Sequence, residues 1–158
     1  MLRGQRLFTF LVCIFMLMPM LVQADEVADL KKRLMSDQKK LIVIQNIEFT
    51  EDEGKFFWPV YENLQEELFQ LDQRTVKLII SYASSPKTCQ ILTDKETVTI
   101  MDEYFDIQKT RTSILDKYME KLAKSLPAQK VFRYLQIENK LEAISRFELA
   151  KKIPLCGL

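Results

Sequence analysis

Apolar residues between Phe57 and Tyr82 recur at alternating intervals of four and three positions. This spacing places their side chains on one stripe of an α-helix, the pattern of a heptad seam. Thr50 and Glu53 form the sequence signature of a capping box at the start of this helix, and the run Ser84-Ser85-Pro86 indicates its end. The sequence therefore predicts a long helix with a buried stripe of Phe57, Tyr61, Leu64, Leu68, Leu71, Thr75, Leu78 and Tyr82.

A second long helix follows the same plan. Thr93 and Glu96 form another capping-box pair, and the predicted stripe behind them consists of Met101, Phe105, Gln108, Thr112, Leu115, Met119, Leu122 and Leu126. Two of these stripe positions, Gln108 and Thr112, are polar. The simpler interpretation is that they control the register of a bundle core. The functional interpretation is a polar patch inside a groove.

Two further helices flank this pair. Pro127 suits the first turn of a helix that ends before Pro154, with a stripe of Val131, Tyr134, Ile137, Leu141, Ile144 and either Phe147 or Glu148. A shorter helix from about Val27 to Asn46 comes first, although the β-branched run at 41–44 leaves a short strand as the alternative. Pro59 is expected either to kink the first long helix or to split off a turn before it.

These elements predict an all-α fold, an elongated antiparallel helical hairpin or bundle of about four helices. Each of the two long helices should span roughly 33 residues, which is about 50 Å at 1.5 Å per residue. Their apolar stripes must be covered, either by each other or by a second copy of the chain in a homodimer.

The first 24 residues are typical of a cleavable secretory signal peptide. Arg3 and Arg6 supply the positive charge, residues 7–17 are mostly apolar, and small residues precede Asp25. An uncleaved membrane anchor is the alternative, but the apolar stretch is shorter than the about 20 residues that a span needs. Cleavage would leave residues 25–158 as a single helical domain without a stable membrane span.

Composition narrows the chemistry further. The chain contains no histidine and only three glycines, which removes the commonest general base and argues against phosphate-binding loops. Its 23 basic and 22 acidic residues nearly cancel, which argues against a nucleic-acid partner. We therefore expect no enzyme activity and no catalytic, cofactor-binding or metal-binding residues.

Two cysteines, Cys89 and Cys156, remain once Cys13 leaves with the signal peptide. An even pair in an exported chain suggests a disulfide. Cys89 lies in the predicted turn between the two long helices, and the last helix runs back toward that turn. The topology therefore favours an intramolecular bridge, with free or intermolecular thiols as the alternative.

The aromatic cluster Phe56-Phe57-Trp58, with Tyr61 and Phe69 nearby, is the candidate protein-contact surface. Three consecutive aromatic residues span nearly the whole circumference of a helix, so they cannot all face one core. One interpretation is that the first helix or a dimer partner buries the cluster. The other is an apolar surface that contacts unfolded or partner proteins.

The segments Phe49-Thr50-Glu51-Asp52-Glu53 and Leu92-Thr93-Asp94-Lys95-Glu96 resemble the LTxxQ motif of the Spy/CpxP family of periplasmic proteins. Glutamate replaces glutamine in both segments, and residues 126–132 form a third related segment without the threonine. The chain from 57 to 154, which includes the segment QIENKL at 136–141, also looks like a group of uncharacterised exported proteobacterial proteins.

Members of the Spy/CpxP family are small all-helical hairpins that dimerise and act as ATP-independent chaperones or as stress adaptors for envelope sensor kinases. The resemblance therefore implies a periplasmic, chaperone-like or envelope-stress adaptor protein, with unfolded or partner envelope proteins as its partners. The alternative is a structural or regulatory interaction module for one dedicated envelope partner.

Overall fold

The computed structural model describes residues 37–83 and 92–151, and every regular element within them is an α-helix. This confirms the predicted all-α helical bundle. The chain divides into two units between Asn46 and Ile47. The predicted signal peptide, residues 1–24, lies outside the described residues.

In the first unit, residues 37–46 are helical. The side-chain amide of Asn46 donates a hydrogen bond to the carbonyl of Ile42 at 2.8 Å, across the last turn of this helix. The β-branched run at 41–44 is therefore part of a helix, and the alternative of a short strand there is wrong.

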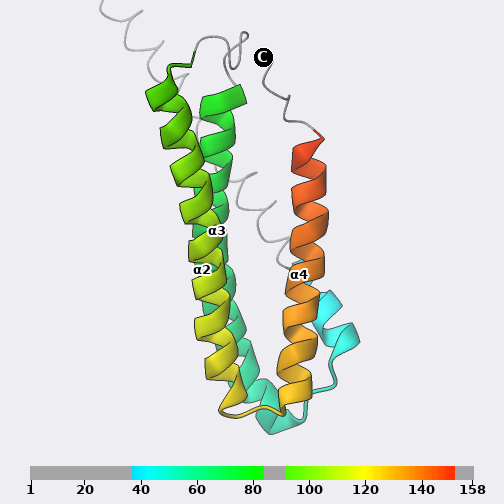
Figure 1. The fold of residues 1–158 in the computed structure, drawn as a ribbon. Coiled ribbons are helices and arrows are strands. Elements are labelled where there is room, and N and C mark those ends of the chain that lie inside the picture. The colour runs from blue at the N-terminus through cyan, green and yellow to red at the C-terminus, as the bar shows by residue number, and fades with distance from the viewer. Residues whose placement is uncertain (1–36, 84–91, 152–158) are drawn as a thin grey trace, which may run out of the picture. The chain divides into compact units, whose positions relative to one another are not determined.

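The second unit contains three helices, α2 (Glu51–Ala83), α3 (Asp94–Ala123) and α4 (Ala128–Ala150), of 33, 30 and 23 residues. Helices α2 and α3 lie side by side and run antiparallel, and α4 runs back in the same direction as α2 (Figure 1). The predicted bounds of the two long helices are confirmed to within a few residues.

Both predicted capping boxes are formed. The Thr50 and Thr93 backbone N–H groups donate to the carboxylates of Glu53 and Glu96 at 2.7 and 2.8 Å. Each glutamate returns a backbone N–H bond to the threonine hydroxyl at 3.3 Å. Pro59 lies inside one continuous α2, so the prediction that it splits off a turn is wrong.

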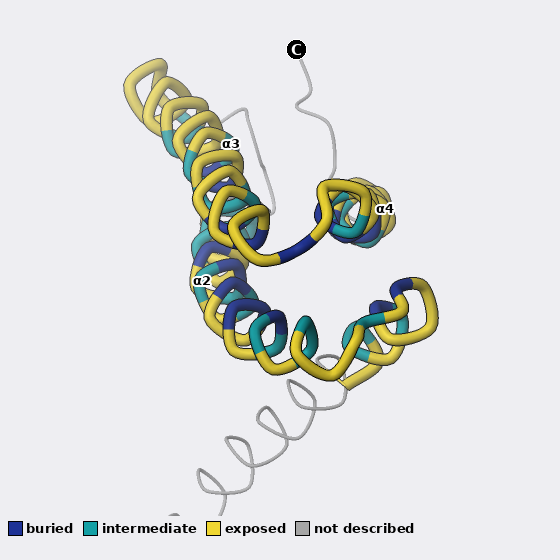
Figure 2. The backbone as a smooth tube through the Cα atoms, turned by 90° about the horizontal axis from the view of Figure 1, so that it is seen from below, coloured by how far each residue is buried: buried dark blue, intermediate teal, exposed yellow. Residues whose placement is uncertain are grey.

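The N-terminal half of α2 carries the predicted buried stripe. Its buried side chains include Phe57, Tyr61, Leu64, Leu68 and Leu71, whereas the later stripe residues Thr75 and Leu78 are only half-buried. Figure 2 shows buried, dark blue segments along the backbone of α2. Heptad spacing therefore identified the buried face of this helix correctly, and packing loosens along its second half.

The buried face of α3 differs from the prediction. Its buried residues are Ile107, Arg111, Tyr118 and Leu122, of which only Leu122 belongs to the predicted stripe; the last stripe residue, Leu126, is buried just beyond the helix. The stripe residues nearest the start of the helix, Met101 and Phe105, are exposed. The reason is that α3 contacts two helices, so one stripe packs on α2 and the neighbouring stripe faces α4.

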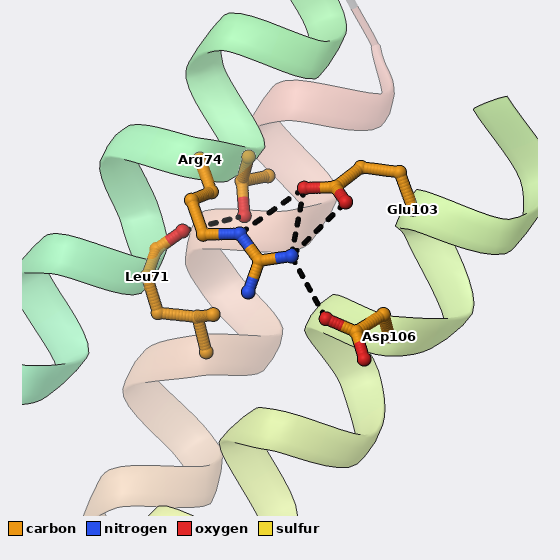
Figure 3. Close-up of polar contacts among 5 residues, drawn as sticks. Leu71, Arg74, Glu103 and Asp106 are labelled. Atoms are coloured by element: carbon orange, nitrogen blue, oxygen red, sulfur yellow. Dashed lines mark hydrogen bonds and ion pairs between the residues drawn. The ribbon is translucent and has the colours of Figure 1, made fainter. Parts of the chain in front are cut away.

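Ion pairs hold α2 against α3 along their length. The guanidinium of Arg74 forms two hydrogen bonds through one nitrogen to the Glu103 carboxylate, at 2.9 and 3.0 Å, and reaches Asp106 at 2.8 Å (Figure 3). Further along, the Glu67 carboxylate accepts bonds from the Lys117 ammonium at 2.6 Å and the Tyr118 hydroxyl at 2.7 Å. These contacts set the antiparallel register of the pair.

Electrostatics at this second contact shift two pKa values. The Lys117 ammonium, followed by the Tyr118 hydroxyl, holds the pKa of the Glu67 carboxyl below 4.5. Desolvation, followed by the bond to Glu67, raises the pKa of Tyr118 to about 12. Tyr118 therefore stays a hydrogen-bond donor to Glu67 at every physiological pH.

Helix α4 packs on α2 through its first half. The Tyr134 ring lies 5.1 Å from Phe57 and 6.0 Å from Tyr61, measured between ring centroids. Gln65 donates hydrogen bonds to the Tyr134 hydroxyl at 3.2 Å and to the buried Glu138 carboxyl at 2.8 Å. Burial, and then the neighbouring Glu138, raises the pKa of Tyr134 well above 10.

Beyond this contact, α4 diverges from the other two helices (Figure 1). Val131, Tyr134 and Ile137 of the predicted stripe are buried, but Ile144 and Phe147 are exposed. The predicted stripe of α4 is therefore confirmed in its first half and wrong at Ile144 and Phe147, because this half of α4 meets α3 through Glu142 and not through the apolar stripe.

Replacing Leu64 by alanine should lower the free energy of unfolding by about 2–5 kcal/mol, because the side chain is fully buried and its loss leaves a cavity. The matched control is Ile80→Ala on the same helix, where the side chain is exposed and the loss should stay under about 0.5 kcal/mol. Urea unfolding followed by circular dichroism measures both. Equal losses for the two variants would contradict the assigned core.

The ion pair between Glu53 and Lys130, at 2.6 Å, joins the starts of α2 and α4 and should make stability depend on pH. The bond from Lys130, followed by the Thr50 backbone N–H, lowers the pKa of Glu53 below 4.5. A lowered folded-state pKa means that the stabilisation is complete above pH 4.5 and is lost as pH falls through the folded-state pKa.

We therefore expect wild type to lose stability toward acid more steeply than Glu53→Gln. Denaturation midpoints measured from about pH 6 down to about pH 3 test this, since the two proteins should converge at the acidic end. A difference that stays constant across this range would show that the Glu53 carboxylate is not the titrating group.

Candidate functional site

An open cleft of about 370 Å³ lies between α3 and α4. Its volume is in the range of small ligand sites. The lining is mostly polar and comes from two turns of each helix: Gln108, Arg111, Thr112 and Leu115 from α3, and Asn139, Glu142, Ala143 and Arg146 from α4.

Two arginines in this cleft share one carboxylate. A terminal guanidinium nitrogen of Arg111 lies 3.3 Å from a carboxylate oxygen of Glu142, and the Nε–H of Arg146 donates to the other oxygen. The Arg111 side chain is only 9% exposed, and that of Glu142 is 22% exposed. The group therefore carries one excess positive charge, with Arg111 buried and Arg146 open to solvent.

The donors of Arg111 are not used up by this contact. A guanidinium has five N–H donors, and the ion pair with Glu142 is the single polar contact of Arg111 among the residues that the structure describes. A buried guanidinium with unused donors that lines a cleft is suited to bind a further acceptor.

Neutral amides complete the polar lining. Gln108 on α3 and Asn139 on α4 make no side-chain hydrogen bond within the described part of the chain. The Thr112 hydroxyl donates to the backbone carbonyl of Gln108 at 3.1 Å. Each wall of the cleft therefore offers at least one free amide donor beside the arginines.

Two exposed aromatic side chains lie beyond the cleft lining, toward the ends of α3 and α4 that are away from the α3–α4 connection. Phe105 lies one helical turn before Gln108 and is 56% exposed. On the opposite wall, Phe147 lies one turn beyond Ala143 and is 64% exposed. Large apolar side chains exposed beside a polar cleft are typical of protein interaction sites.

The aromatic cluster predicted as a contact surface has a different place in the structure. Phe57 and Tyr61 are buried, and Phe56, Trp58 and Phe69 are half-buried. These side chains pack inside the fold and do not form an exposed contact surface.

Ring contacts within that cluster show how it packs. Phe49 stacks on Phe57 at 4.3 Å between ring centroids, and Trp58 meets Tyr61 edge to face at 5.5 Å. With Tyr134 from α4, these rings form the aromatic core at the base of the three-helix unit. The interpretation of the cluster as a buried core therefore fits the structure better than that of an open surface.

The cysteine pair, Cys89 and Cys156, lies outside the described residues, so the disulfide stays a prediction. Arg111, Glu142 and Arg146 were not identified from the sequence. The polar pair at 108 and 112, for which the sequence left both register control and a groove patch open, lies in the cleft wall beside them.

Two negative findings concern the residues from 37 to 83 and from 92 to 151. Within these ranges, no three histidine, cysteine or acidic side chains are grouped so that they could hold a metal ion. No helix in the same ranges combines the length and apolar character needed to cross a membrane.

Replacing Glu142 by alanine should lower the free energy of unfolding by roughly 1–3 kcal/mol, because Arg111 would stay buried without its carboxylate partner. The matched control is Glu148→Ala, which breaks an exposed pair with Lys151 and should cost under about 0.5 kcal/mol. Thermal and urea unfolding measure both variants. A neutral Glu142→Ala would mean that Arg111 does not depend on this carboxylate.

No protein-family model matches the chain, and no curated protein or solved structure matches it with significant similarity. The likeness to the Spy/CpxP family therefore stays a prediction, and any function must be argued from the geometry of the second unit.

Proposed function

We propose that this protein binds other proteins through exposed apolar faces of α3 and α4, in a chaperone-like or stress-adaptor role that needs no nucleotide. The observation that carries the proposal is the group of large apolar side chains that α3 and α4 leave exposed. On α3 these are Met101, Tyr104 and Phe105, and on α4 they are Ile144 and Phe147.

Uncovered apolar surface favours the binding of another protein over the binding of a small ligand. Burial of apolar area contributes about 25 cal/mol per Å², so two phenylalanines and a methionine that become covered can drive association. Helices that diverge also present two faces to a partner at once, which suits an extended or partly folded chain. The predicted signal peptide supports a place of action in the periplasm.

A specific observation favours a second candidate, a regulatory interaction module for one dedicated envelope partner. The Arg111, Glu142 and Arg146 group is a defined charged feature of the cleft, next to the exposed apolar side chains of α3 and α4. Polar groups of this kind favour one complementary partner over many, because a mismatched partner leaves them unpaired. Neither candidate requires catalysis.

The test is suppression of aggregation without ATP. A chemically denatured client is diluted into buffer that contains the purified protein, and light scattering is followed over time. We expect wild type to reduce scattering at about one protein per client. The double variant with Phe105→Ser and Phe147→Ser should need several-fold more protein, because two exposed apolar contacts are lost.

The matched control is Ile80→Ser, which removes an equally exposed apolar side chain from α2, a helix that contributes no residue to the cleft, and should act like wild type. No suppression by wild type at a large excess would reject the chaperone role. Capture of one folded envelope protein, lost in the double variant and kept in Ile80→Ser, would then support the dedicated-partner module.

A further inference from the structure

We propose that the α3–α4 cleft binds a partner segment through one carboxylate, which the guanidinium groups of Arg111 and Arg146 receive while Phe105 and Phe147 cover apolar side chains beside it. The occupant is an amphipathic segment of another protein with a single acidic residue on its apolar face. This inference rests on the proposed protein-binding function and names the chemistry that its partner must have.

The charged side chains that line the cleft leave it with a net positive charge. Arg111 and Arg146 share the single Glu142 carboxylate, so the cleft has a net charge of one positive unit. Glu142 is already the counter-charge of the buried Arg111, so the unbalanced positive charge belongs to the two arginines as a group, with Arg146 the more exposed of them. A negatively charged group that enters the cleft would balance this charge.

The kind of anion follows from Glu142. A single carboxylate brings the cleft to neutrality, whereas a doubly charged phosphate would overshoot and face the Glu142 oxygens at close range. The unbonded amides of Gln108 and Asn139 are neutral donors on opposite walls. They can donate to the oxygens of a carboxylate without adding charge. The cleft therefore favours a monoanion.

The exposed rings of Phe105 and Phe147 decide between a free metabolite and a protein segment. Phe105 and Phe147 lie about one helical turn from the polar lining, on the same side of it. A small acid would leave both rings exposed. A segment with apolar side chains three or four positions from its acidic residue would cover them, and that spacing is the spacing of one helix face.

The test uses two synthetic helical peptides of about 16 residues, a length that forms about four turns. Both carry leucines on one face, and they differ at one central position, which is Glu in one peptide and Gln in the other. Isothermal titration calorimetry measures the affinity of each for the full chain. We expect the Glu peptide to bind at least about tenfold more tightly, because charge-assisted bonds to arginine are lost with Gln.

Variants of the protein show which arginine causes the preference for the Glu peptide. Arg111→Gln should remove the preference and leave both peptides at the affinity of the Gln peptide. Arg146→Gln, at a more exposed position, should reduce the preference without disturbing the fold. Arg133→Gln on α4 is the matched control, because its exposed side chain lies outside the cleft lining, and it should keep the full tenfold preference.

The charge of the anion that the cleft prefers is tested by competition. Acetate should displace the Glu peptide more effectively than inorganic phosphate at equal concentration, and the reverse order would overturn the assignment of a monoanion site. Equal affinity of the Glu and Gln peptides, or no binding of either, would overturn carboxylate recognition. Those results would leave the proposed function standing, because suppression of aggregation is measured independently of any acidic residue.

Discussion

The contact between Gln65 of α2 and the buried Glu138 of α4 is the constraint on which the rest of the second unit depends. A buried carboxyl group must have a hydrogen-bond partner, so the register of α4 along α2 is tied to the position of this pair. The rings of Phe57, Tyr61 and Tyr134 pack around it and add apolar contact. Once α4 is held at this point, its remaining turns diverge from α2 and α3, and the cleft is the space that results.

Stability and binding are therefore assigned to opposite ends of α4. The end near the α3–α4 connection carries the aromatic core and the ion pair between Glu53 and Lys130, which close the structure. The far end carries the exposed Phe147, and the corresponding end of α3 carries the exposed Phe105. Exposed aromatic side chains add nothing to folding by themselves, so their presence here is consistent with selection for contact with another protein.

Arg111 takes part in both the stability of the fold and the proposed binding. It occupies the buried stripe of α3, where an aliphatic side chain would pack with less desolvation cost. Its guanidinium is held by Glu142 on one side and lines the cleft on the other. A buried arginine in this place sacrifices some core stability for a defined positive site, which an apolar residue could not provide.

Local chemistry was sufficient to predict the helices and their starts. Capping boxes at Thr50 and Thr93 depend on residues three positions apart, and heptad spacing in α2 depends on one helix meeting one continuous neighbour. These features can be recognised in the chain without knowledge of its partners in space. The all-α class, the bounds of α2 and α3, and the buried stripe in the first half of α2 follow from them.

Only the tertiary structure decided which side chains are buried or grouped together between the helices. The spacing of α3 could not show that the helix meets two neighbours, so the buried face was placed one position away from Ile107 and Arg111. The exposure of Phe147 and the grouping of Arg111 with Glu142 depend on where α4 diverges, which is set by contacts between residues more than thirty positions apart. Periodicity describes one helix at a time, whereas a cleft is a property of two.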